Sequence, residues 1–167
     1  MATYKSKNKE LCFADGEWNT NGQKIRKVYA AEACTGKNLI HMVLTENGWT
    51  GYALGSGGSK KEYVLGFPVD TYASGEIMDV IVGGICSGVN IGNSATAAKS
   101  TFTKGKTVRL SSGYIYSSGG ATMADMALLG RSTAAGATGS QIGVALSSGA
   151  TYTVDIYLYP DRTVVTT

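Results

Sequence analysis

The sequence predicts a mainly β domain, a sandwich or barrel built from two similar β units, with little helix. Short stretches of alternating apolar and polar residues recur along the chain at roughly ten-residue spacing. The 167 residues include 23 glycines but only 2 prolines, which is typical of many tight turns between short elements. The 10 tyrosines greatly outnumber the 3 phenylalanines, as suits half-exposed sheet faces.

Composition and length place the chain among folded domains. Hydrophobic residues make up 43% of it and charged residues only 16%, so it can bury a core and lacks the charge density of a disordered chain. Its length suffices for one domain or two very small ones. We expect residues 1–30 to form an N-terminal arm and lead-in, followed by a duplicated β domain over residues 31–167.

Two segments alternate most clearly, as a strand does when one of its faces is buried. Each places three apolar side chains on one face: Val154, Ile156 and Leu158 in one, and Met78, Val80 and Val82 in the other. Asp79 and Asp155 fall on the opposite faces, and we interpret them as edge or surface charges that discourage aggregation between strands. The helical signal is weak; "ATMADMALL", with Thr122 as its N-cap, is compatible with about two turns.

These segments belong to an apparent internal repeat. Residues 63–82 and 140–158 both read apolar-Gly-x-x-apolar, then a polar turn with glycine, then apolar-Asp-apolar-x-apolar. Three pairs of positions match, the last with one residue of slip: Gly66 with Gly143, Val69 with Leu146, and Asp79 with Asp155. Upstream, "TGKNLIHMVLTENGW" resembles "KGKTVRLSSGYIY". The alternative is chance similarity among glycine-rich strands.

The repeat predicts two β units, at residues 36–82 and 105–158, that cover each other's apolar faces. A two-stranded piece buries too little apolar area, at about 25 cal/mol per Å², to offset the chain entropy that it fixes. Two such units can bury their apolar faces against one another.

The net charge of +3 comes from the beginning of the chain. Lys5, Lys7 and Lys9 lie within residues 1–10, whereas basic and acidic residues balance from Tyr63 onward. Two interpretations are open: a solvated, mobile terminus, or an arm that lies on an acidic partner surface. A general nucleic-acid binder would need a broader basic face, so we expect no nucleic acid among the partners.

Two glycine-rich stretches raise the question of a phosphate-binding loop, and their residues argue against one. "KGKT" at 104–107 leads into "TVRL", a predicted strand, where a P-loop requires a helix, and Ser100 stands where the first glycine of that motif belongs. In "LGRSTAAGATGSQIGVALSSG", residues 129–149, the glycine spacing differs from the dinucleotide-binding pattern. We interpret this stretch as a loop that leads into a strand and predict no cofactor.

The residue types that carry catalysis or bind metals are sparse. His41 is the only histidine, and it alternates with apolar residues in "LIHMVL" as a buried strand residue does. Carboxylates are scattered, and no cluster of His, Cys or Asp indicates a metal site. Cys12, Cys34 and Cys86 are odd in number and lack a CxxC spacing, so we expect free thiols. We predict a protein that is not an enzyme, with no catalytic, cofactor-binding or metal-binding residues.

Trp18 and Trp49 are isolated, and each fits the core, a subunit contact or a sugar platform. A sugar site usually gathers carboxylates and amides around its aromatic side chain, so we favour core or interface. The start "MATYKSKNKEL" has no apolar signal core, and no apolar run reaches membrane-spanning length. We therefore expect synthesis in a cytoplasm and no membrane partner.

Three stretches carry a family resemblance: "EACTGKNLIHMVLTENGWTGYAL", "YVLGFPVDTYASGEIMDVIVGGI" and "LLGRSTAAGATGSQIGVALSSGATYTVDIYL". They resemble the small head decoration, or cement, proteins of tailed bacteriophages. Chains of that family run through a Gly-Lys or Gly-Asp turn, a strand, a Gly-apolar-Ala strand, an Ala-x-Gly-Glu turn and a Val-x-Val strand. Here the turns are "TYASGE" at 71–76 and, more loosely, "SSGATY" at 147–152.

The resemblance implies a β-barrel-like or β-tulip subunit, often trimeric, that sits on the outer capsid surface and clamps neighbouring capsomers. It implies the major capsid protein as partner, a virion location and no catalytic residues. Under it, Lys5, Lys7 and Lys9 form a candidate capsid-contact arm, and Trp18 and Trp49 are candidate subunit or capsid contacts. The alternative is a carbohydrate-binding or adhesin-like β module of a phage tail or fibre, which the tyrosines, tryptophans and glycine loops favour. An enzyme with a dispersed site fits least.

Overall fold

The computed structural model describes residues 8–53, 62–90, 100–102, 104, 106–111, 114–122, 140–146, 149–151, 153–161 and 163–165. These residues form a 3-10 helix, η1, and short β-strands. The elements are η1 (Lys9–Phe13), β1 (Glu17–Trp18), β2 (Gln23–Ala30), β3 (Ile40–Thr45), β4 (Gly48–Ala53), β5 (Glu62–Pro68), β6 (Ile77–Asn90), β7 (Ser100–Phe102), β8 (Lys106–Ser111), β9 (Tyr114–Thr122), β10 (Ser140–Ala145), β11 (Gly149–Thr151), β12 (Thr153–Leu158) and β13 (Thr163–Val165). The prediction of a mainly β fold with little helix is confirmed.

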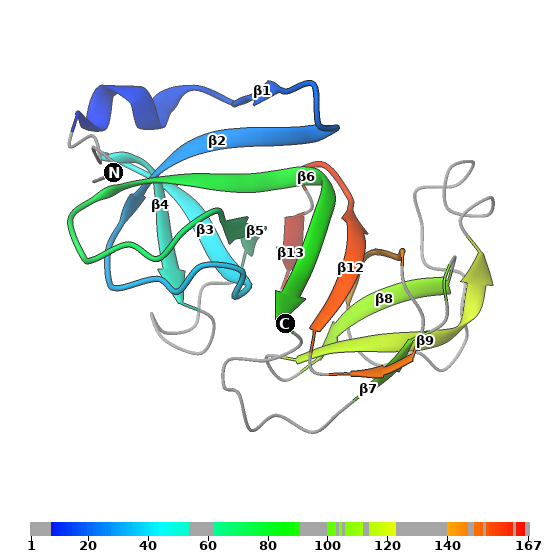
Figure 1. Ribbon diagram of the computed structural model, residues 1–167. Helices are drawn as coiled ribbons and strands as arrows, with labels where there is room; N and C mark the ends of the chain where they lie inside the picture. The colour runs from blue at the N-terminus through cyan, green and yellow to red at the C-terminus, as the bar shows by residue number, and fades with distance from the viewer. Residues whose placement is uncertain are drawn as a thin grey trace.

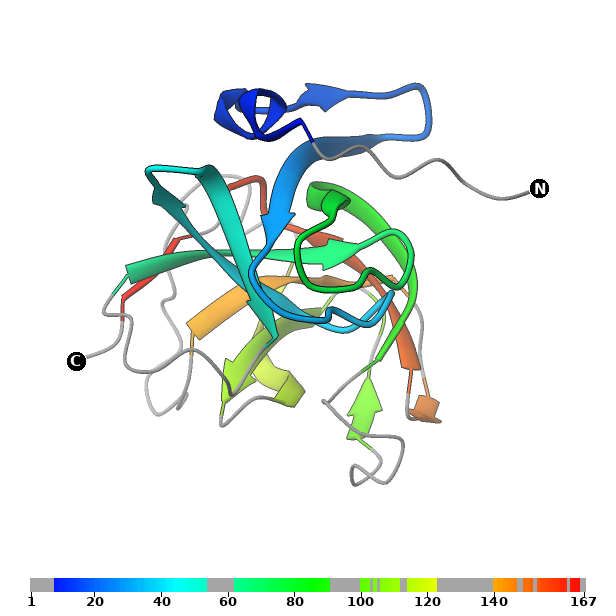
Figure 2. The ribbon, with the colours of Figure 1, turned by 90° about the vertical axis from the view of Figure 1, so that its left-hand side faces the viewer.

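Five strands close into a barrel, which confirms the predicted barrel. β2 pairs in parallel with β4, and antiparallel pairs then link β4 to β3, β3 to β5, β5 to β6, and β6 back to β2. Figures 1 and 2 show η1 and β1 as a separate layer over β2, on the outside of this barrel. β2 therefore has the barrel on one side and the N-terminal layer on the other.

Alternating side chains fill the barrel interior. Met78, Val80 and Val82 of β6 point into it, as their spacing predicted. They pack against apolar side chains of the other barrel strands, among them Val28, Ala30, Ile40, Met42 and Val64. Residues 23–30, which the predicted division assigns to the lead-in, form β2 and complete the barrel wall.

A second core fills the space between the barrel and the later strands. Leu65 and Phe67 of β5 face this core, whereas Val64 faces the barrel interior. Their partners include Cys86 and Val89 of β6 and the buried face of β12, which is Val154, Ile156 and Leu158 as predicted. β5 and β6 are therefore covered on both faces.

The strand pairings repeat along the chain. β6 and β12 are neighbours in the sheet. Outward from β6 the order is β5, β3 and β4, and outward from β12 it is β10, β8 and β9. In chain order these strands correspond as β3 to β8, β4 to β9, β5 to β10 and β6 to β12, so the two halves have the same strand order. The matched sequence positions share their hydrogen bonds as well. The Val69 N–H donates to the Asp79 carbonyl at 2.9 Å, and the Leu146 N–H donates to the Asp155 carbonyl at 2.7 Å.

Strand β6 belongs to both halves of this arrangement. Its first half pairs with β2 and β5, and its second half pairs with β12. Gly84 lies at the changeover, opposite Gln23 of β2 and Leu158 of β12, with a φ of 89°. Figure 1 shows the strand running along β2 and then turning down beside β12. A Cβ at Gly84 would collide with the carbonyl oxygen of Gly22, so the turn requires glycine.

The structure corrects one expectation in part. Asp79 and Asp155 are not edge charges, because β6 and β12 are both paired on two sides, but the Asp79 side chain is a surface charge with 40% exposure. Their carboxylates instead bind local partners: Asp79 pairs with Lys27 Nζ at 2.5 Å, and Asp155 accepts from the Gly88 N–H at 2.7 Å. Thr122 is the last residue of β9, and the helix that the sequence predicts after it lies outside the described residues.

Candidate functional site

The N-terminal layer is fixed to the barrel by its own short-range contacts. Asn8 caps η1, because its side chain accepts a hydrogen bond from the Glu10 N–H at 3.1 Å. η1 then packs on β2 and β4, with the Cys12 side chain fully buried beneath it. A Cβ at Gly48 of β4 would lie 2.6 Å from the Cys12 carbonyl oxygen, so glycine permits this close packing.

Among the candidate contact lysines, Lys9 lies on the barrel rather than on a free arm. Its Nζ lies 4.2 Å from the centroid of the Tyr29 ring and 3.4 Å from Asn47 Oδ1. Lys5 and Lys7 lie outside the described residues. The layer from Asn8 onward is therefore held in place. Lys5 and Lys7, the other two candidate contact residues, directly precede it in the sequence.

Three large apolar side chains protrude from this layer. Leu11, Phe13 and Trp18 are exposed by 43%, 56% and 52%. Single exposed apolar residues are ordinary, but here three large ones lie within residues 11–18. We call Leu11, Phe13 and Trp18 the apolar platform.

The two tryptophans have different environments. Trp18 lies on the outer strand β1, and its ring edge approaches the chain at Gly84. Trp49 of β4 is half-buried against the barrel core, and the Arg26 guanidinium carbon lies 4.1 Å from the centroid of its ring. Trp18 is thus available for contact, whereas Trp49 packs largely within the chain.

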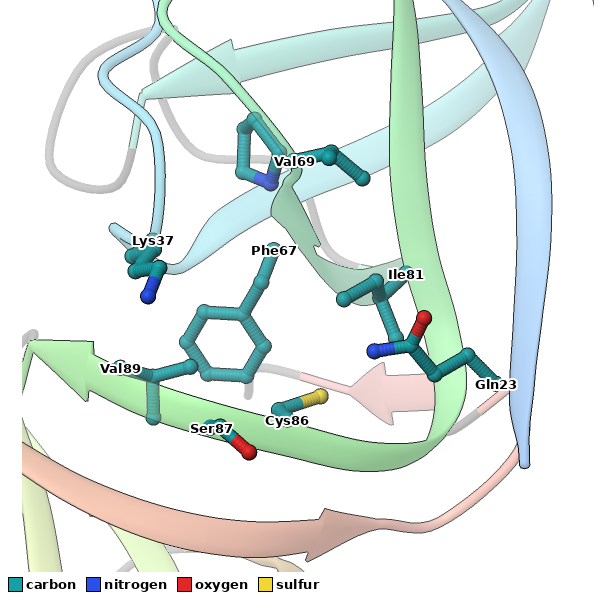
Figure 3. A pocket seen from close by; sticks show the side chains of 9 residues that line it. Gln23, Lys37, Phe67, Val69, Ile81, Cys86, Ser87 and Val89 are labelled. Carbon is teal, nitrogen blue, oxygen red and sulfur yellow. The ribbon is translucent and has the colours of Figure 1, made fainter. Parts of the chain in front are cut away.

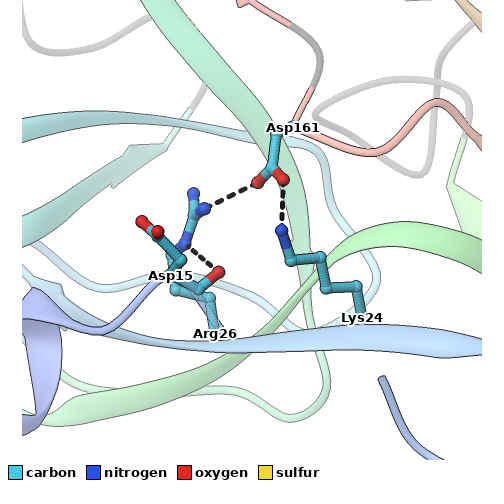
Figure 4. A network of polar contacts seen from close by, with 4 residues as sticks. All are labelled: Asp15, Lys24, Arg26 and Asp161. Carbon is cyan, nitrogen blue, oxygen red and sulfur yellow. Dashed lines mark hydrogen bonds and ion pairs between the residues drawn. The ribbon is translucent and has the colours of Figure 1, made fainter. Parts of the chain in front are cut away.

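Figure 4 shows a charged network in which two basic side chains of β2 reach one carboxylate. The carboxylate of Asp161 accepts from Arg26 Nη2 at 2.6 Å and from Lys24 Nζ. Arg26 Nε also donates to the Asp15 carbonyl at 3.0 Å, which ties the N-terminal layer to the barrel. Arg26 is only 2% exposed, and its Nη1 has no hydrogen-bond partner among the described residues. No local sequence pattern indicates this network, because Arg26 and Asp161 are 135 positions apart.

The three thiols are free, as the sequence predicted, and all three are buried. Burial raises the pKa of Cys12 and of Cys34 to about 11, and that of Cys86 to about 12. A nucleophilic cysteine needs a lowered pKa, so these side chains act as small apolar groups. His41 is a buried strand residue, as predicted, and it stacks on the Tyr52 ring with the centroids 5.4 Å apart.

A pocket of about 190 Å³ lies beside β5 and β6, at the border of the second core. Figure 3 shows the Phe67 ring at its centre, with Lys37 and Gln23 on opposite sides. Its lining is mostly apolar: Gln23, Lys37, Phe67, Pro68, Val69, Ile81, Cys86, Ser87 and Val89. Sequence reasoning did not single out any of these residues as a binding site, because they come from four separate segments.

No protein-family model, curated protein or solved structure matches the chain. Within the described ranges, no group of three or more His, Cys, Asp and Glu side chains could hold a metal ion. The same residues contain no helix long and apolar enough to cross a membrane. The apolar platform and the pocket are two features of the described chain that a partner or a ligand could contact.

Proposed function

We propose that the chain is a structural virion protein that binds the outer surface of a phage capsid. It bridges neighbouring capsomers as a trimer and stabilises the shell. The observation that carries the proposal is the apolar platform. Leu11, Phe13 and Trp18 are exposed on a layer that the barrel already holds in place.

The geometry of the platform favours docking onto a protein surface. Because η1 and β1 are ordered before any partner arrives, binding would cost less conformational entropy than the ordering of a free arm. Aromatic side chains such as Phe13 and Trp18 bury large areas at low entropy cost and are typical interface anchors. The basic residues that precede the layer complement an acidic surface.

The repeated strand pairings support the proposal from a second direction. The stretches that resemble phage decoration proteins include β3, β4, β5, β6, β10 and β12, six of the eight strands whose order repeats. A trimer would present three platforms at once. Linked weak contacts bind much more tightly than one contact alone, so each platform can be small.

Mass spectrometry of purified virions tests this proposal. We expect the chain to co-purify with intact particles in hundreds of copies, and to bind capsids assembled without it. A handful of copies per particle would place the chain in the tail instead. Absence from virions, together with no binding to undecorated capsids, would refute the proposal.

One observation favours a second candidate, a carbohydrate-binding or adhesin-like module of a phage tail or fibre. The exposed indole of Trp18 presents a flat apolar face of the kind on which sugar rings stack. A glycan array distinguishes the candidates. Specific glycan binding that Trp18→Ala abolishes would favour the module, whereas capsid binding without glycan binding would favour decoration.

A further inference from the structure

The pocket beside β5 and β6 combines a buried apolar floor with a polar rim. Phe67, Cys86 and Val89 are fully or almost fully buried and form the floor with Pro68. Lys37, Val69 and Ser87 are exposed and lie at the rim. A ligand that fits this arrangement has an apolar body and a polar end.

The position of Lys37 at the rim is fixed by its backbone. Its N–H donates to the Pro68 carbonyl at 2.9 Å, and its carbonyl accepts from the Asn90 N–H at 3.0 Å. These bonds hold it between the end of β5 and the end of β6. Its φ of 62° lies in the left-handed region, which costs a lysine about 1 kcal/mol and which glycine or asparagine adopts more easily. Lys37 thus occupies the rim although its left-handed backbone conformation is unfavourable for lysine.

The Lys37 ammonium group is available to a ligand. It forms no ion pair with any part of the chain that the structure describes, and its Nζ reaches over Gly88, where a Cβ would lie 3.5 Å from it. None of the lining residues is acidic. Asp155, whose Oδ1 accepts the Gly88 N–H at 2.7 Å, lies beside Gly88 but is not among the lining residues.

Gln23 and Ser87 are the other polar residues that line the pocket. Gln23 Nε2 donates to the Ile85 carbonyl at 2.9 Å, and its Oε1 accepts from Asn19 Nδ2 at 3.2 Å. Gln23 therefore supports the wall. Figure 3 shows the exposed Ser87 hydroxyl pointing away from the Phe67 ring, so Lys37 is the cation that a ligand in the pocket can reach.

We propose that this pocket binds a small monocarboxylate with a ring-sized apolar body. The body packs against Phe67 and Val89, and the carboxylate pairs with Lys37 Nζ. The size agrees with this class of ligand. An apolar cavity of about 150 Å³ holds benzene, so a volume of about 190 Å³ accommodates a benzene-sized ring with its carboxylate at the rim.

Phenylacetate is the probe, and its binding to the full chain is measured by saturation-transfer NMR and calorimetry. The Lys37→Asn variant removes the cation, and asparagine tolerates the left-handed backbone at this position. We expect it to weaken phenylacetate binding about fivefold or more, as loss of a charge-assisted hydrogen bond does. Lys104→Asn, at an exposed lysine outside the pocket, is the matched control and should bind as the wild type does.

Two further measurements separate the pocket from nonspecific attraction. Benzyl alcohol has the ring without the charge, and we expect the wild type and Lys37→Asn to bind it equally and weakly. Val69→Trp covers the pocket mouth from an exposed position and should abolish phenylacetate binding while the circular dichroism spectrum is retained. No phenylacetate binding by the wild type, or equal binding by folded Lys37→Asn, would overturn the proposal.

Discussion

Gly66 and Gly143 occupy matching positions in two strand pairs, and each lies too close to the neighbouring strand for a side chain. A Cβ at Gly66 of β5 would lie 2.5 Å from Val80 Cγ1 and 3.0 Å from the Ile81 carbonyl oxygen. A Cβ at Gly143 of β10 would collide with the Tyr157 carbonyl group. Both are packing positions within strands, not turns, so the repeated glycine has one physical role in both places.

Alanine at either glycine should destabilise the fold. Overpacking of a well-packed site costs about 1–3 kcal/mol, and more where the obstacle cannot move. We expect Gly143→Ala to be the more damaging, because it meets backbone, whereas Gly66→Ala first meets a valine methyl group. Urea denaturation measures both. Gly75→Ala is the control: its φ of 87° is unfavourable for alanine, but no atom lies within 4 Å of its Cβ. An equal or larger loss in Gly75→Ala would contradict the packing argument.

Asp161→Asn should lower the free energy of unfolding more than substitution of a partly exposed residue usually does. Asparagine tolerates the positive φ of 50° at this position but leaves the buried Arg26 without its counter-charge. We expect a loss of about 2–3 kcal/mol, since an uncompensated buried charge is costly. Asp79→Asn breaks the exposed pair with Lys27 and should cost less than about 1 kcal/mol. If the two variants had the same denaturation midpoint, the burial of Arg26 would not increase the cost of losing its ion pair.

The Cys86 thiol should make stability fall at alkaline pH. An unfolded thiol ionises near pH 9.0, whereas burial raises the pKa of Cys86 to about 12. The folded state therefore keeps a proton that the unfolded state releases, and this contribution is complete below pH 9 and lost between pH 9 and 12. Cys86→Ala removes it. We expect the difference in unfolding free energy between wild type and variant to shrink from pH 8 to pH 10.5; a constant difference would contradict the raised pKa.

The apolar platform can be removed without harm to the barrel. Phe13 and Trp18 are more than half exposed, so the double variant Phe13→Ser/Trp18→Ser should retain its thermal midpoint within a few degrees. If the platform is the capsid contact, the dissociation constant for undecorated capsids should rise at least about 30-fold. Val69→Ser, at an equally exposed valine on the β5–β6 connection, is the control. Unchanged capsid binding by the folded double variant would exclude the platform as the contact.

Period-two alternation predicted the strands whose buried face is apolar. Val154, Ile156 and Leu158 are buried and Asp155 faces the other way, as the sequence indicated. The same rule misjudged how the sheet is covered. Ile81, on the face of β6 opposite Met78 and Val80, packs against the second core, and Ile77 on that same face is buried as well. Local alternation shows which residues share a face, but not how many layers cover the strand.

The sequence did not predict the features that join distant segments. β2, "QKIRKVYA", contains three basic residues, so its sequence did not indicate a barrel strand. Arg26 is nevertheless buried, because its charge is neutralised by Asp161 near the other end of the chain. Lys9 was predicted as part of an arm, but its contacts with Tyr29 and Asn47 hold it on the barrel. Such contacts depend on the tertiary fold, so no spacing rule identifies them.

The turn of β6 at Gly84 has a consequence for how the protein comes apart. The strand is shared, so neither half can lose it without exposing the apolar face that the other half covers. Partial melting of one half would therefore be as unfavourable as melting of both. We expect the molecule to unfold in one cooperative transition. Under mechanical force, the whole length of the shared strand should oppose the unfolding of either half.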